Sequence, residues 1–434
     1  MSDSASTRDV SLQARLSAHL RTPLYRNAYA LVVNSATTSV LGVAYWLLAA
    51  RSYSTEAIGL NSATLSTMIF LATLSQLNLG SAMNRFIPSA GQATGRLVVY
   101  AYVIVTLAAL ATSGIFLLGV HAWAPTLSFW SSNLIFVAWF TVAIMAWCIF
   151  SLQDGVLIGL RQSTWVPVKN ITFSLAKIAL LLGLVQLLPL HGVFASWTIP
   201  AMILLVPTDL LIFRRLIPQH VRVSASQSAP IIPGQIVRYV AGDYAGSIIS
   251  IAATSLLPII VTERLGATTA AYFYLPWTVA YSLYLVSFNM GMSLIAEGSA
   301  DQTKLDTYSY RLFVQMARLL VPAVIVLVVG APYILRLFGQ SYAEEGTLLL
   351  RLLSLSALPE IIIAVATSVL RVQRRMGAVV VIMSVSSVAS LGLSLVLLNV
   401  YGIVGIGVAF LVSQTAVAIV LVCTRLGTAW LFRH

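Results

Sequence analysis

Long apolar stretches separated by short polar segments dominate the hydrophobic pattern of this chain. About twelve of them could cross the roughly 30 Å hydrocarbon layer of a bilayer as helices. Helices are the expected form, because backbone polar groups inside a bilayer must be satisfied within each element. The predicted spans are 27–50, 58–84, 96–120, 131–153, 166–189, 192–213, 237–262, 267–295, 311–333, 347–370, 377–400 and 403–424.

Composition agrees with an all-α membrane protein. Of the 434 residues, 59% are hydrophobic and 9% are charged, whereas soluble domains carry roughly 25% charged residues. Cys148 and Cys423 lie in separate apolar segments, which excludes a CxxC metal or redox site. The first 26 residues are polar and lack the apolar stretch of a signal peptide, so we expect this end to stay in the cytoplasm.

The net charge of +12 would suit a nucleic-acid binder, but its distribution points to a membrane. With a cytoplasmic N-terminus, most of the 25 Lys and Arg residues fall in cytoplasmic segments. The opposite side holds Arg51, Arg264, Arg336 and Arg351. This asymmetry follows the positive-inside rule, so we predict a multi-pass protein of the cell (cytoplasmic) membrane with both termini cytoplasmic and no nucleic-acid partner.

The spans fall into two similar halves. The segment 214–236, rich in Ser, Gln and Pro, is the predicted cytoplasmic linker between an N-lobe at 27–213 and a C-lobe at 237–424. Residues 1–26 and 425–434 are the predicted cytoplasmic ends. The repeated segments 55–59 and 262–266, and 191–193 and 401–403, recur at nearly equal offsets. We therefore expect two pseudo-symmetric six-helix lobes around a central cavity.

Three charged residues inside spans are candidates for transport. Lys177 lies near the middle of the fifth span and should point inward, either to hold an anionic headgroup or as a neutral or ion-paired packing residue. Glu360 follows Pro359 near mid-bilayer and is either a coupling carboxyl or a structural polar contact. Asp243, early in the seventh span, is a weaker coupling candidate. Asp154 and Asp209 lie near cytoplasmic ends, where pairing is expected.

Other candidates for substrate binding are basic or aromatic. Arg51 and Arg85 end the first two spans, where they are either interfacial anchors or part of the expected cavity beside them. Arg318 either snorkels to headgroups, which we favour, or enters the cavity. Trp277, Tyr281 and Tyr284 share one face of the eighth span. Such a face either stacks on sugar rings or packs against helices or lipid.

Signals for an enzyme are weak. His121 and His191 occur singly in short outer loops, and the chain has no GxxxxGK[ST] phosphate loop. We predict a protein that is not an enzyme and uses neither cofactor nor metal. A membrane enzyme of polysaccharide assembly is the alternative from another class.

Several loose motifs together resemble one family. They are the segment 50–59, Leu79–Ala82 with Arg85 and Phe86, Gly159–Arg161, and Tyr401–Ala409. With these, the chain resembles the multidrug/oligosaccharidyl-lipid/polysaccharide (MOP) exporter superfamily, and within it the Wzx-like polysaccharide flippases. The resemblance covers nearly the whole chain and implies a MATE-like fold whose two lobes open alternately to either side.

The resemblance also implies a substrate. It would be an oligosaccharide linked through pyrophosphate to a polyprenol, moved between leaflets during cell-surface polysaccharide biosynthesis, with membrane lipids and a polymerase or glycosyltransferase as partners. The alternative is MATE-type, proton- or cation-coupled multidrug export. Many drug exporters carry an acidic residue in the first span, and residues 27–50 contain no Asp or Glu.

Overall fold

The computed structural model describes residues 23–224, 233–300 and 302–432, and it is built from α-helices joined by short turns and 3-10 segments. We call α2–α9 the N-half and α10–α15 the C-half. The N-half helices are α2 Pro23–Ser52, α3 Thr55–Gln76, α4 Leu79–Ala90, α5 Thr94–Trp123, α6 Leu134–Gly159, α7 Trp165–Gly183, α8 Gly192–Leu211 and α9 Ile217–Ser224. The C-half helices are α10 Pro233–Leu265, α11 Ala267–Ala300, α12 Leu305–Phe338, α13 Gln340–Val372, α14 Met376–Tyr401 and α15 Ile403–Thr424.

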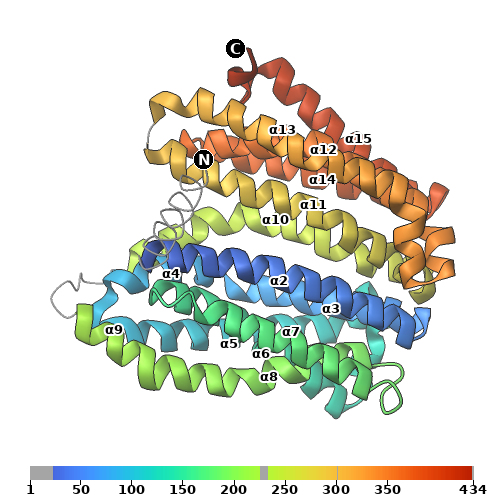
Figure 1. Cartoon of the computed structure of the whole chain (residues 1–434). Coiled ribbons are helices and arrows are strands. Elements are labelled where there is room, and N and C mark those ends of the chain that lie inside the picture. The colour runs from blue at the N-terminus through green and yellow to red at the C-terminus, as the bar shows by residue number, and fades with distance from the viewer. Residues whose placement is uncertain (1–22, 225–232, 301, 433–434) are drawn as a thin grey trace, which may run out of the picture.

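The helices are long and apolar enough for a polytopic membrane protein. Within the described residues, 10 helices or continuous helix runs meet the length and hydropathy expected of membrane spans. Two further helices, α2 with 30 residues and α10 with 33, run alongside them in the same bundle (Figure 1). The prediction of an all-α membrane protein is confirmed.

The two halves lie side by side, with the N-half below and the C-half above in Figure 1. Helix α3 joins them, because it packs against both α10 and α11. Gly59 of α3 makes this approach possible, since a Cβ atom there would collide with the backbone of Ala267. Corresponding helices of the two halves begin about the same number of residues apart in the sequence. For example, α7 begins at Trp165 and α14 at Met376. This spacing supports the predicted division into two lobes, which stays a prediction.

One expected repeat does not mark equivalent positions. The segment at 55–59 begins α3, whereas the similar segment at 262–266 ends α10 and makes the turn to α11. Gly266 adopts φ 84, which favours glycine, and this single residue joins the two helices. The sequence match therefore reflects two different local structures.

The second predicted span is broken rather than continuous. Helix α3 ends at Gln76, Leu77 and Asn78 adopt φ 48 and φ 55, and α4 starts at Leu79. The break frees carbonyl groups of α3, and the Tyr244 hydroxyl of α10 donates to one of them, the carbonyl of Leu74. An interhelical hydrogen bond is thus made possible where the helix is interrupted.

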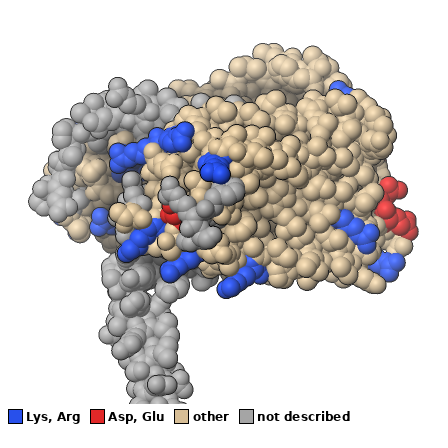
Figure 2. Space-filling view, turned by 90° about the horizontal axis from the view of Figure 1, so that it is seen from above, with Lys and Arg blue, Asp and Glu red and all other residues tan. Residues whose placement is uncertain are grey.

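The predicted linker at 214–236 is partly helical. Its first described part continues α8 through a π-turn at Ile212–Leu216 into α9, and Pro233 already begins α10. Figure 2 shows most of the visible Lys and Arg atoms toward the end of the molecule that carries these segments. We call this the predicted inner end, and the end with the turns at 53–54, 124–133, 184–191, 266, 339 and 402 the predicted outer end.

Candidate functional site

A cavity inside the N-half surrounds Lys177. Its volume is about 320 Å³, and side chains of α2, α3, α6, α7 and α8 line it. Lys177 is only 6% exposed, which confirms that it points inward. The lining residues are Asn34, Thr38, Ile69, Trp147, Phe150, Ser151, Asp154, Asn170, Phe173, Ser174, Lys177 and Trp197.

Aromatic rings enclose the ammonium group of Lys177. Its Nζ lies 4.1 Å from the ring centre of Trp197, 4.7 Å from that of Tyr45 and 5.4 Å from that of Phe173. The Tyr45 hydroxyl is held 2.8 Å from Ser196 Oγ, which orients its ring. Each cation–π contact contributes about 0.5–2 kcal/mol, so the cage offsets part of the cost of burying the charge.

We call Tyr45, Phe173 and Trp197 the Lys177 cage, and several polar groups in and around it have no partner that the structure describes. In the described part of the chain Lys177 makes no ion pair with a carboxylate. The buried indole N–H of Trp197 and the buried Oδ1 of Asn34 also have no hydrogen-bond partner among the described residues. Two unsatisfied donors and one acceptor therefore border the same cavity, and such groups are costly unless water or a ligand meets them.

A second lysine of α7 is fully paired. Lys169 is 5% exposed, and its Nζ lies 2.6 Å from Asp154 Oδ1. The same ammonium donates to the carbonyl of Phe150, and Asn170 donates to the other Asp154 oxygen at 3.2 Å. The predicted pairing of Asp154 is confirmed, and the pair leaves little free charge at this rim of the cavity.

Asp209 is held by neutral donors. Tyr102 donates to its Oδ1 at 2.8 Å, and Gln153 donates to the same atom at 2.9 Å. These bonds join α5, α6 and α8 near the predicted inner end. Sequence reasoning expected pairing here and did not identify the partners.

In the C-half, Glu360 lies beside two tyrosines. Glu360 is half-buried on α13, and its carboxyl group lies near Tyr281 and Tyr284 of α11. Tyr284 Oη lies 2.6 Å from Ser356 Oγ on α13. The aromatic face on α11 is present, with Trp277 stacked on Tyr281 at 5.7 Å. Trp277 itself is 7% exposed and packs edge-on against Phe410, and its role in substrate binding stays a prediction.

The remaining candidates lie elsewhere. Arg85 on α4 and Arg318 on α12 are exposed. Asp243 falls within α10, but its side chain lies outside the described residues. The structure therefore gathers Lys177 with Tyr45, Phe173 and Trp197, and Glu360 with Tyr281 and Tyr284, as two separate groups.

Arg51 forms hydrogen bonds between the two halves at the predicted outer end. Its Nε and Nη2 donate to the carbonyls of Leu337 and Arg336, at 2.7 and 3.2 Å. These carbonyls end α12, where the helix dipole favours a cation. At the same end, Glu263 of α10 accepts hydrogen bonds from the backbone N–H of Thr126 at 3.0 Å and from its hydroxyl at 2.9 Å.

His191 is a packing residue at the same end. Its ring stacks on Phe129 at 5.1 Å and lies beside Trp130. Burial lowers the pKa of His191 below its ordinary value, which favours the neutral ring. Within the described residues, no group of His, Cys, Asp and Glu side chains is arranged to hold a metal ion.

The residues that complete the Lys177 cage were missed by sequence reasoning. Tyr45, Phe173 and Trp197 lie on three different helices, α2, α7 and α8. Phe173 is one turn from Lys177 and could have been found by helical spacing. Tyr45 and Trp197 could not, because only the packing of three spans brings them together.

No family model and no curated protein matches the sequence. Solved structures do match, at low sequence identity. An inward-facing structure of a multidrug resistance MATE family transporter of the MOP superfamily matches with a TM-score of 0.69 at 14% identity, covering 94% of this chain and 99% of that one. The lipid II flippase MurJ, in an inward closed conformation, matches with a TM-score of 0.65 at 10% identity, covering 91% of this chain and 87% of that one.

A third solved structure also matches. An outward-facing structure of a MATE family transporter gives a TM-score of 0.62 at 13% identity, covering 94% of this chain and 96% of that one. The fold of this chain is therefore similar to the fold of these MATE transporters and of the lipid II flippase MurJ.

Proposed function

We propose that this protein is a flippase for a polyprenyl-pyrophosphate-linked oligosaccharide. The observation that carries the proposal is Lys177, an ammonium group buried within the spans, caged by aromatic rings and without a carboxylate partner among the described residues. A buried cation of this kind attracts an anion strongly, because the low dielectric around it strengthens the attraction. Phosphate oxygens suit both Lys177 and the indole N–H of Trp197.

The aromatic lining suits the rest of the headgroup. A sugar ring presents an apolar C–H face and polar hydroxyls, which fit Trp147, Trp197 and Phe173 together with the free acceptor of Asn34. The cavity volume of about 320 Å³ is at the small end for ligand sites. It would hold the phosphate and the nearest sugar, while the remaining sugars would extend into space opened between the halves.

Reconstituted vesicles test the proposal. A fluorescent polyprenyl-pyrophosphate oligosaccharide should become accessible in the opposite leaflet at a rate that depends on the protein, and Lys177→Ala should abolish this movement while expression stays normal. A wild-type protein that moves no such lipid, but exports a cationic dye on a proton gradient, would overturn the proposal.

Multidrug export is the second candidate, and one observation favours it. An inward-facing structure of a multidrug resistance MATE family transporter shares the fold at least as closely as MurJ does. Against it, a cationic drug entering the N-half cavity would meet the unpaired charge of Lys177. The dye experiment distinguishes the two functions.

The wider arrangement follows from the same proposal. The protein would reside in the cytoplasmic membrane with both termini inside and pass its product to a polysaccharide polymerase. Glu360, assisted by Asp243, would couple the cycle to an ion gradient, because a carboxyl group beside Tyr281 and Tyr284 can bind and release a cation.

A further inference from the structure

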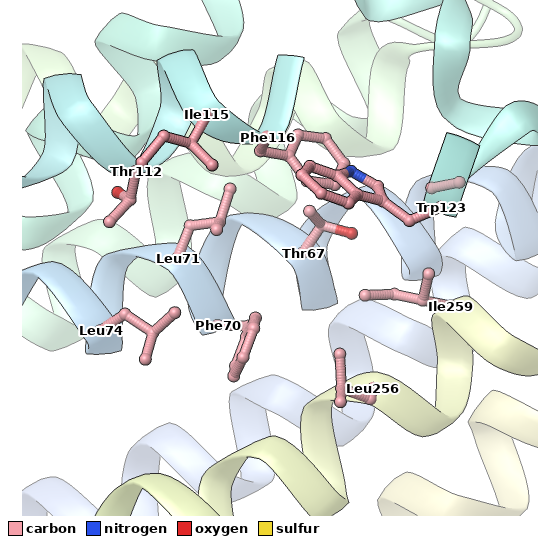
Figure 3. A pocket seen from close by; sticks show the side chains of 11 residues that line it. Thr67, Phe70, Leu71, Leu74, Thr112, Ile115, Phe116, Trp123, Leu256 and Ile259 are labelled. Carbon is pink, nitrogen blue, oxygen red and sulfur yellow. The ribbon is translucent and has the colours of Figure 1, made fainter. Parts of the chain in front are cut away.

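A second cavity lies where the two halves meet. Its volume is about 440 Å³, and α3, α5 and α10 line it (Figure 3). Its floor is buried and includes Leu71, Phe116 and Ile259, whereas Ile115 and Trp123 on its rim are 62% and 53% exposed. All three helices belong to the bundle, so the rim faces the hydrocarbon layer rather than water. We call this cavity the lateral groove.

The lateral groove is lined mainly by apolar side chains. Its polar side-chain groups are the hydroxyls of Thr67 and Thr112 and the indole N–H of Trp123, which lies on the exposed rim. The Thr67 hydroxyl donates to the carbonyl of Ala63 at 2.8 Å, and Thr112 Oγ1 lies 2.7 Å from Ser75 Oγ. Because both hydroxyls are already bonded, the groove matches a hydrocarbon chain and would disfavour water or a sugar.

Hydrogen bonds between the halves bound the groove at both ends. Toward the predicted outer end, Glu263 on α10 bonds Thr126, just after the groove residues Trp123 and Ala124. Toward the other end, the Tyr244 hydroxyl bonds the carbonyl of Leu74, which also lines the groove. A hydrocarbon chain in the groove would therefore contact both halves between these hydrogen bonds, and its binding would depend on the relative position of the halves.

The groove and the Lys177 cavity share one helix. Ile69 of α3 lines the Lys177 cavity, and Phe70 and Leu71 line the lateral groove. The two sites thus lie at one depth on different sides of α3. A lipid with a charged headgroup and an apolar chain fits this arrangement, with the headgroup suited to the Lys177 cavity and the chain to the lateral groove.

We propose that the lateral groove binds the isoprenoid chain of the carrier lipid during transport. This inference rests on the proposed function and adds a site for the tail to the site for the headgroup. The methyl-branched chain fills the space between Phe70, Phe116 and Leu256, and its departure accompanies separation of the halves.

A photoreactive polyprenyl phosphate, with its reactive group in the chain, tests the site in proteoliposomes. Crosslinks should concentrate on peptides of α3, α5 and α10 that line the groove, and excess unlabelled polyprenyl phosphate should remove them while phospholipid does not. Leu256→Trp, which fills the groove, should lower both crosslinking and lipid transport about tenfold. Leu118→Trp is the matched control, because Leu118 lies on α5, is 88% exposed and does not line the groove.

The outcomes separate the groove from the proposed function. Transport of the lipid-linked sugar with crosslinks spread equally over the lipid-facing side, or removed equally by phospholipid, would overturn the groove and leave the function standing. Prenyl-specific crosslinks in a protein that moves no lipid-linked sugar would support the groove and reject the function. Equal activity of Leu256→Trp and Leu118→Trp would also overturn the groove.

Discussion

Lys169 and Lys177 lie two turns apart on α7, about 12 Å along its axis, and are buried to the same degree. Lys169 is bonded to Asp154 and to the carbonyl of Phe150. Lys177 contacts three aromatic rings and forms no ion pair with a described residue. The same side chain on the same helix thus has its charge neutralised at one position and left available at the other. Burial alone therefore does not distinguish the two lysines, whereas the presence or absence of a carboxylate partner in the described part of the chain does.

The difference has an energetic consequence. Taking an ammonium group out of water costs several kcal/mol, and a carboxylate at hydrogen-bonding distance returns most of this cost. At Lys169 this cost is offset within the protein, by Asp154 and the carbonyl of Phe150. At Lys177 the three ring contacts offset only part of the desolvation cost. We therefore expect Lys177 to contribute to the binding of an anion and little to the stability of the fold.

The largest expected effect comes from breaking the internal pair. Lys169→Met should lower the free energy of unfolding by about 3 kcal/mol, the lower end for buried pairs, because Asp154 stays 31% exposed. Thermal unfolding in detergent measures it. Lys169→Met combined with Asp154→Asn should recover most of the loss, since no charge is then left unpaired. Equal destabilisation by the single and double variants would show that the pair is not the cause.

The matched substitution at Lys177 should act on binding instead. Lys177→Met removes an unpaired charge, so unfolding should be unchanged or shifted to higher temperature. Affinity for a short-chain, water-soluble sugar pyrophosphate should fall about 10- to 100-fold, as expected for loss of a charge-assisted hydrogen bond worth about 1.5–3 kcal/mol. Calorimetric titration measures the affinity. If Lys177→Met instead lowered stability and kept normal affinity, Lys177 would have the same structural role as Lys169, and the proposed difference between them would be wrong.

A smaller effect should follow at the cage. Trp197→Phe keeps a ring beside Lys177 but removes the unpartnered indole N–H. Affinity for the same pyrophosphate should fall about fivefold, close to the value of one neutral hydrogen bond. Tyr45→Phe is the control, because its hydroxyl is already bonded near Val193 and Ser196. It should cost stability and leave affinity unchanged, and the reverse pattern would contradict the assignment of the donor.

The contrast between the lysines also shows how far the sequence could lead. Hydropathy and charge asymmetry were sufficient to predict the all-helical membrane fold and the inward direction of Lys177, because both depend on local properties of each span. The sequence placed Lys169 among cytoplasmic basic residues, and nothing in its spacing identified Asp154 as its partner. Which charge is paired depends on how α6 packs on α7, and this is a property of tertiary structure.

Other features were beyond the sequence for similar reasons. The second span is interrupted at Leu77 and Asn78, and neither of these two positions is a proline or glycine. The Tyr244 hydroxyl on α10 donates a hydrogen bond to the carbonyl of Leu74 beside the break. Arg51 was expected beside a central cavity, but its partners are carbonyls of α12, nearly 300 residues later in the chain. Contacts between halves arise only once both halves have folded.

The smallest change in stability is expected at Glu360, which extends the comparison to the C-half. Glu360→Gln conserves size, so the free energy of unfolding should change by less than about 1 kcal/mol. Pyrophosphate affinity should also stay normal, because Glu360 is not part of the Lys177 cavity. Transport in vesicles should instead lose its response to an imposed ion gradient. Glu345→Gln, an exposed acid on the same helix, is the control and should keep the response. A normal gradient response in Glu360→Gln would assign the carboxyl to packing beside Tyr281 and Tyr284, whereas a loss of pyrophosphate affinity would mean that the two halves share a single site.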